Sequence, residues 1–269
     1  MMLLATTVAL ALSAATATGD FVPRTVEAEA KGTASASLNG LTNPALVGFR
    51  LRYMNGDHEL NSIAVKPSSG DVLAILRDQN HDDDMSMRVT YGGWDFYRSY
   101  DVTAKCRGAC TIPIVDPPSA LAGTKRLVLV GFDVLVQNPS DRDRRVRVLS
   151  IRPSADEQSF RAEFRDNGTF DYSVNIRYAW IASGHSGKLS DTATRTAAQR
   201  TQQVEIGQPL ASQDAAEFIA GFSVEFTNGE HNLRDIAFEK SATGQYSVRF
   251  NDANYDDPMT ATLDRVWIR

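Results

Sequence analysis

The chain has 269 residues, of which 42% are apolar and 23% charged, as is ordinary for a soluble globular protein. The length suffices for one large all-β domain or for two to three small ones. A net charge of -5 and a pI near 5.4 argue against a nucleic-acid-binding protein, because no basic face is available to neutralise phosphates.

The N-terminal segment predicts export. Residues 1–17 form an apolar stretch that ends in the small-x-small triplet Ala15-Thr16-Ala17, which is how a secretory signal peptide ends. We expect cleavage after Ala17 and a secreted, extracellular protein. No other run is long and apolar enough to cross a bilayer. Residues 18–43, rich in Ala, Thr, Ser and Gly, predict a linker or a loosely attached first strand.

The rest of the chain is organised by a unit that occurs three times. A Gly-Phe pair followed by apolar residues at every second position opens each copy, and a Trp falls near each end. The middle copy is degenerate. The copies span residues 44–100, 127–182 and 216–269, and residues 101–126 and 183–215 connect them.

Alternation of apolar and polar residues predicts four strands in each copy. Asn55-Gly56 is typical of a type I′ hairpin turn, because both residues tolerate a positive φ. We therefore expect each copy to be a four-stranded antiparallel meander, with further strands in the connecting segments, such as 110–114 and 203–206. A lone meander cannot bury its apolar face. The predicted fold class is all-β, with antiparallel β-sandwich modules packed side by side.

The two cysteines, Cys106 and Cys110, lie four residues apart, and Gly108 would help so short a loop to close. In an exported protein the default is a local disulfide. A metal half-site is the alternative, but the chain has no second Cys pair.

Acidic loops recur in the first and third copies, and a meander would bring the first and third turns to the same edge of its sheet. Several carboxylates at one place are costly to ionise unless a cation is present. Calcium fits, because it takes many oxygen ligands in flexible geometry. The predicted metal ligands are Asp57, Asp78, Asn80, Asp82, Asp83, Glu230, Asp252, Asn254, Asp256 and Asp257, and the predicted binding residues beside them are Asn55, His58, Asn228 and His231.

Other interpretations of these loops stay open. Asp and Asn suit solvated turns and need no metal there. Another metal could bind through His58 or His231, and either imidazole could act as a base beside Asp57 or Glu230. No Gly-x-Ser-x-Gly or His-Glu-x-x-His motif is present, so we expect no enzyme. The middle copy lacks the carboxylate cluster, and we expect it to bind no metal.

The ends of two copies, Trp180-Ile181-Ala182 and Val266-Trp267-Ile268, resemble the closing strand of H-type lectin domains. Those domains are six-stranded β-sandwiches that bind N-acetylgalactosamine-type sugars as oligomers. The resemblance covers a few residues in each copy and carries over no sugar-contacting residue. It implies a small sandwich with a binding edge.

Three functions are compatible with these features. The first is an exported, non-enzymatic repeat protein that recognises a surface glycan or matrix component, with calcium shaping its loops. The second is a structural subunit of an extracellular or virion assembly, in which loops and Trp side chains form contacts between copies of the chain. The third is a hydrolase that uses the His/Asp edge.

Overall fold

The computed structural model describes residues 21, 23–78, 83–94, 98–117, 119, 124–137, 145–199, 201–210, 215–254 and 257–269. Its regular elements are all strands, and the described residues contain no helix that could span a membrane. The all-β prediction is confirmed. The strands are β1 (Arg24–Lys31), β2 (Thr33–Ser37), β3 (Pro44–Tyr53), β4 (Ser62–Ser68), β5 (Asp71–Arg77), β6 (Asp84–Gly93), β7 (Ser99–Pro113), β8 (Thr124–Val136), β9 (Val148–Pro153), β10 (Ser159–Arg165), β11 (Asp171–Ser183), β12 (Ser186–Arg195), β13 (Val204–Ile206), β14 (Ala216–Phe226), β15 (Asp235–Lys240), β16 (Tyr246–Asn251) and β17 (Met259–Ile268).

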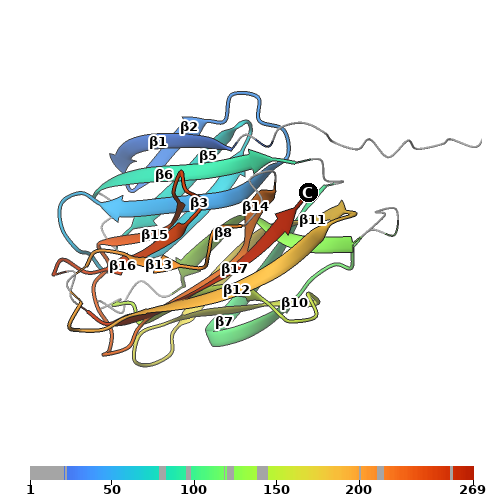
Figure 1. The fold of residues 1–269 in the computed structure, drawn as a ribbon. Helices are drawn as coiled ribbons and strands as arrows, with labels where there is room; N and C mark the ends of the chain where they lie inside the picture. Colours follow the sequence, from blue (N-terminus) through green and yellow to red (C-terminus); the bar gives the residue numbers. More distant parts are fainter. Residues whose placement is uncertain are drawn as a thin grey trace, which may run out of the picture.

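These strands form two antiparallel sheets in a sandwich-like arrangement (Figure 1). The six-stranded sheet has the order β1-β6-β3-β15-β16-β13, and the eleven-stranded sheet has the order β12-β17-β14-β9-β10-β7-β11-β8-β4-β5-β2. The larger sheet turns a corner in β7, whose residues 99–107 pair with β11 and whose residues 108–113 pair with β10. The inward side chains of both sheets share one large apolar core.

The expected meander is wrong. In the first copy β3 pairs with β6 and β4 pairs with β5, but these two pairs lie in different sheets. Asn55-Gly56 therefore lies in a crossover between sheets rather than in a hairpin. The reason is long-range pairing: β3 has β6 on one edge and β15 on the other, which leaves no free edge for β4. The sequence of the turn itself does not indicate which distant strand pairs with the edge of β3.

The copies are also not separate modules packed side by side. The first strand of each copy pairs with the second strand of another copy: β3 with β15, β14 with β9, and β8 with β4. Each copy thus completes a sheet begun by its neighbour. The copies could not be separated without breaking these ladders.

The Gly-Phe pair that opens each copy lies where the strands of two copies meet. A Cβ atom on Gly131 would lie 2.6 Å from the carbonyl oxygen of Val65, and the corresponding distance is 2.8 Å at both Gly48 and Gly221. Only glycine fits so close to a neighbouring backbone. The rings that follow these glycines contact one another at centroid distances of 5.2 to 5.4 Å, and they belong to Phe49, Phe132 and Phe222.

A disulfide joins Cys106 and Cys110 at the corner of β7. In a regular strand, residues four apart have Cα atoms about 13 Å apart. Here the Cα atoms are 5.7 Å apart, because the chain folds at Gly108, whose φ is +64°. The disulfide therefore closes the bend at which β7 leaves β11 and joins β10.

The segments outside the copies supply further strands. Within residues 18–43, β1 pairs with β6 and β2 pairs with β5, so a first strand and not a linker is found there. The strands expected near 110–114 and 203–206 lie in β7 and β13. The predicted signal peptide lies outside the described residues. Trp180 is buried in the core, whereas Trp94 and Trp267 are half-buried.

Candidate functional site

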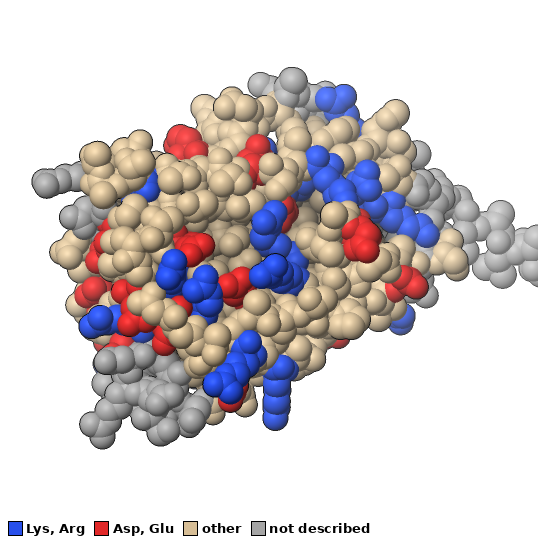
Figure 2. All heavy atoms as spheres, turned by 90° about the horizontal axis from the view of Figure 1, so that it is seen from below, with Lys and Arg blue, Asp and Glu red and all other residues tan. Residues whose placement is uncertain are grey.

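The crossovers between sheets gather at one end of the molecule, which we call the loop end: of the described residues, it comprises 54–61, 78, 83, 227–234, 252–254 and 257–258. Backbone hydrogen bonds tie these loops together, since His58 and Leu233 exchange two of them, at 2.9 and 2.8 Å. His231 and Val146 do the same at 2.8 and 3.0 Å. Figure 2 shows several acidic side chains, with basic ones among them, at the left edge, which is the end to which β3 points in Figure 1.

In the first copy three side chains close a ring of polar contacts. The amide nitrogen of Asn55 donates to Oδ1 of Asp83 at 2.7 Å. The imidazole of His58 lies between the two, with Nδ1 2.9 Å from Asp83 Oδ2 and Nε2 3.1 Å from Asn55 Oδ1. The ring also packs on Tyr53, with centroids 4.7 Å apart. Only 12% of the Asp83 side chain and 22% of the His58 side chain are exposed.

The third copy repeats this cluster. Asn228 donates to Oδ1 of Asp257 at 2.7 Å. The imidazole of His231 has Nδ1 3.0 Å from Asp257 Oδ2 and Nε2 3.0 Å from Asn228 Oδ1. Its packing partner is Phe226, at 4.8 Å between ring centroids, and a second carboxylate, Asp252 Oδ2, lies 3.8 Å from Nδ1. The two Asn-x-x-His turns therefore build the same geometry twice.

The hydrogen bonds define the role of the imidazole. Because the amide nitrogen of Asn55 faces a carboxylate, its amide oxygen must face His58. Both ring nitrogens of His58 therefore face oxygen atoms. A ring held in this way bridges Asp83 and Asn55. Neither nitrogen is directed outward as a general base would be.

The same groups could hold a cation. One ligand atom each from His58, Asp78 and Asp83 lie within 4.8 Å of one another, and the third copy matches this with His231, Asp252 and Asp257. Carboxylate oxygens and imidazole nitrogens are ordinary ligands of divalent ions. Both oxygens of Asp83 already contact Asn55 or His58, so a cation would have to replace the contact of the imidazole.

The other predicted ligands are placed differently. Asp57 is half-buried and is not one of the converging groups. Glu230 accepts a hydrogen bond from the backbone nitrogen of Asn167 at 2.9 Å and so links the third copy to the middle one. The backbone nitrogen of Asn254 donates to Asp252 at 2.9 Å, while its side chain is exposed. Asn80, Asp82 and Asp256 lie outside the described residues.

At this end the middle copy is built from different contacts. Asp166 accepts from the backbone nitrogen of Gly168 at 2.6 Å, and Asn167 accepts from Arg147 at 3.2 Å. Among the residues that the structure describes, no third group of metal-ligating side chains converges here. Residues 138–144 of this copy lie outside the described part of the chain.

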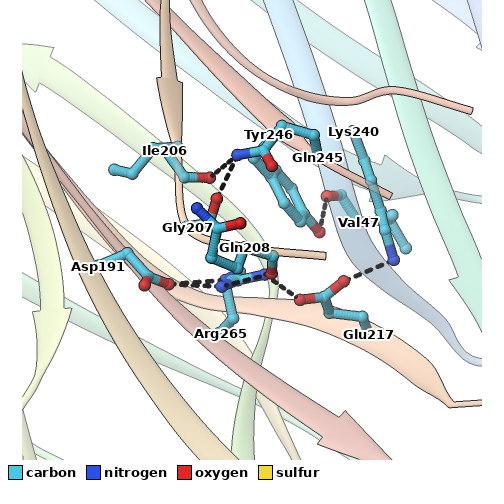
Figure 3. Close-up of polar contacts among 10 residues, drawn as sticks. All are labelled: Val47, Asp191, Ile206, Gly207, Gln208, Glu217, Lys240, Gln245, Tyr246 and Arg265. Carbon is cyan, nitrogen blue, oxygen red and sulfur yellow. Dashed lines mark hydrogen bonds and ion pairs between the residues drawn. The ribbon is translucent and has the colours of Figure 1, made fainter. Parts of the chain in front are cut away.

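A second polar feature, which we call the charge network, lies away from the loop end, near the start of β14 and the end of β17. Figure 3 shows its contacts. Arg265 in β17 contacts Glu217 in β14 and Asp191 in β12, each at 2.5 Å, with the Arg265 and Glu217 side chains at most 1% exposed. The other carboxylate oxygen of Glu217 lies 2.5 Å from Nζ of Lys240. The buried hydroxyl of the neighbouring Tyr246 donates to the carbonyl oxygen of Val47 at 3.0 Å, and burial holds the pKa of Tyr246 well above its usual value.

The charge network is special to the third copy. When the three copies are aligned by the pairing of their first and last strands, the position of Arg265 is a tyrosine in each of the other two copies. The position of Glu217 is Pro44 in the first copy and Leu127 in the middle one. The tyrosines are Tyr91 and Tyr178. Sequence reasoning missed this network, although aligning the three final strands would have shown an arginine where two tyrosines stand. Buried ion pairs are costly to assemble and more costly to break, so this substitution calls for an explanation.

Comparison with known proteins adds no family to these observations. No protein-family model matches the chain. No curated protein matches its sequence at a significant level. Function at the loop end and at the charge network therefore has to be inferred from their own chemistry.

Proposed function

We propose that the protein is an exported, non-enzymatic recognition protein that binds a surface glycan or matrix component through its loop end. The observation that carries this proposal is the repeated Asn-His-Asp cluster, which has the same contacts in the first and third copies. Two crossovers held in the same conformation at one end present two equivalent surfaces. Such a pair suits a repetitive ligand, because two weak contacts on one partner reinforce each other.

The chemistry of the clusters supports binding rather than catalysis. Each imidazole is held between a carboxylate and an amide oxygen, so neither ring nitrogen is directed toward a substrate. Asn55 and Asn228 are exposed at the surface of the loops, and each amide has two N–H donors and two acceptor lone pairs, of which the cluster uses one each. Hydroxyl-rich ligands are recognised by groups of this kind.

Calcium is a separate part of the proposal. In this account a Ca²⁺ ion enters between Asp78 and Asp83, or between Asp252 and Asp257, and the imidazole moves aside. Calorimetric titration of the mature chain with Ca²⁺ tests it, with Asp83→Asn and Asp257→Asn as loss variants. Saturable binding by the parent and none by the double variant supports the ion, whereas no binding by the parent leaves each imidazole as the partner of its carboxylate.

The recognition proposal is tested on a glycan array, with and without chelator. Asp83→Asn and Asp257→Asn should each weaken binding, and the double variant should abolish it. Asp166→Asn is the matched control, because it removes a carboxylate at the same end from the copy that lacks the cluster. Ordered oligomers without glycan affinity would instead favour the assembly-subunit alternative.

A further inference from the structure

A cavity of about 590 Å³ opens between the upper part of the six-stranded sheet and the turn that joins β15 to β16. It lies at the end of β15 opposite the loop end, roughly 17 Å away along the strand. Its apolar walls include Phe21, Pro209 and Leu210. Hydroxyl groups and one ammonium group complete the lining, from Thr25, Thr90, Ser241, Thr243 and Lys240.

The corresponding places in the other two copies are smaller or bridged. Lys240, Pro67 and Pro153 each lie two residues after the residue that pairs with the phenylalanine of another copy's Gly-Phe pair, so the three positions correspond. The cavity beside Pro67 has a volume of only about 240 Å³. In the turn that follows Pro153, Glu157 forms an ion pair with Lys188 at 3.3 Å.

The charge network explains how Lys240 is held at the wall of this cavity. Its ammonium group contacts Glu217, which is fully buried, and Arg265 holds the other oxygen of that carboxylate (Figure 3). The other two copies have a proline and a second apolar residue where Lys240 and Glu217 stand. The third copy has thus replaced apolar packing by an oriented donor beside this cavity.

We propose that this cavity binds a neutral, polyhydroxylated ligand of one to two sugar rings. The charges within the network balance, because Lys240 and Arg265 face Glu217 and Asp191. Lys240 lies in the cavity lining, and the buried carboxylate of Glu217 behind it neutralises its charge. An ionic ligand would therefore gain little attraction in exchange for its lost hydration, which favours a neutral ligand. The volume lies within the range of small-molecule sites, which combine apolar walls with a few placed polar groups.

The hydrogen-bonding groups match hydroxyl ligands. An ammonium group has three N–H donors, so Lys240 keeps donors beyond the one directed at Glu217. Thr25 and Thr90 share a hydroxyl contact at 2.8 Å, and Ser241 and Thr243 share one at 2.7 Å. Such pairs can each donate and accept when a ligand hydroxyl joins them.

The test is saturation-transfer NMR and calorimetry on the mature chain. The probes are neutral hexoses and disaccharides, with uronic acids and amino sugars as charged counterparts of the same size. We expect a neutral sugar to bind and its charged counterparts to bind at least tenfold more weakly. Binding of the uronic acids alone, or of no sugar in the panel, would overturn the proposal.

Variants locate the binding. Thr90→Val should weaken it about tenfold by removing one hydroxyl. Ala242→Trp, on the exposed turn, should fill the cavity and abolish binding without touching the charge network. Thr262→Val is the matched control, because Thr262 forms a similar threonine pair with Thr192 on the larger sheet. Full affinity in folded Ala242→Trp would contradict the site.

Variants at the two ends of the molecule distinguish this cavity from the loop end as the sugar-binding site. The Asp83→Asn and Asp257→Asn double variant should bind the neutral sugar as the parent does, since its substitutions lie at the opposite end. Lys240→Met should weaken sugar binding and leave any loop-end glycan binding unchanged. If the loop-end variant loses sugar binding and Ala242→Trp keeps it, the sugar binds at the loop end and the cavity is not a site.

Discussion

Removing the imidazole of the first cluster should destabilise the protein by an amount that depends on Asp83. In His58→Ala, Oδ2 of Asp83 loses its contact with the imidazole, and the Asp83 side chain is 12% exposed. Leaving a buried polar group unpaired costs about 1–3 kcal/mol. Lost packing on Tyr53 adds to this. We expect a total loss of about 2–3 kcal/mol in His58→Ala.

The pairing is measured by a double-mutant cycle with Asp83→Asn, using urea unfolding followed by tryptophan fluorescence. Since the double variant has no carboxylate left unpaired, the two effects should fail to add by about 1 kcal/mol. The same cycle on His231 and Asp257 should give a similar value, because the contacts match. His185→Ala, at an exposed position, should change stability little. Additivity within about 0.4 kcal/mol in both cycles would refute the account of the cluster.

Three further predictions concern the frame that carries these sites. Gly131→Ala should lower the stability of the fold by about 1–3 kcal/mol, because the added methyl group forces two strands apart. Thermal unfolding measures this against Gly184→Ala, where a Cβ atom meets open space. Equal effects of the two substitutions would contradict the close approach at Gly131. Replacing Cys106 and Cys110 by Ser should lower the free energy of unfolding by at most about 2 kcal/mol, because the closed loop is short. A larger loss of stability in urea unfolding would show that the disulfide does more than close the corner of β7. Burial raises the pKa of Asp235, so this carboxyl keeps its proton to higher pH in the folded protein than in the unfolded one, and the stability that it contributes falls as the pH rises through the folded pKa. Asp235→Asn should remove this pH dependence from the free energy of unfolding. Parallel pH profiles of parent and variant from pH 4 to 7 would contradict the prediction.

Strand positions could be read from the sequence, because alternation of apolar and polar residues follows from burial of one face. The meeting of Asn55, His58 and Asp83 was also anticipated, although by the wrong topology. Successive strands of a copy alternate in direction, so the first and third connections reach the same end whether the strands share a sheet or lie in two. These three side chains therefore meet as predicted, although the predicted pairing of the strands is wrong.

The exchange of strands between copies could not be read from one copy alone. β15 pairs with β3 where Gly48 lies close to the backbone of Phe238, and no local pattern in the sequence identifies that distant partner. The charge network was missed for a different reason. Glu217 and Arg265 interrupt an apolar pattern in two separate strands, and only their pairing in space shows that each compensates the other.

The most direct test of the proposed function is binding of the mature chain to a glycan array, measured beside the double variant Asp83→Asn and Asp257→Asn. The account predicts that the parent binds a defined set of glycans and that the folded double variant binds none of them, while Asp166→Asn binds as the parent does. Equal binding by the parent and the folded double variant would contradict recognition through the loop end.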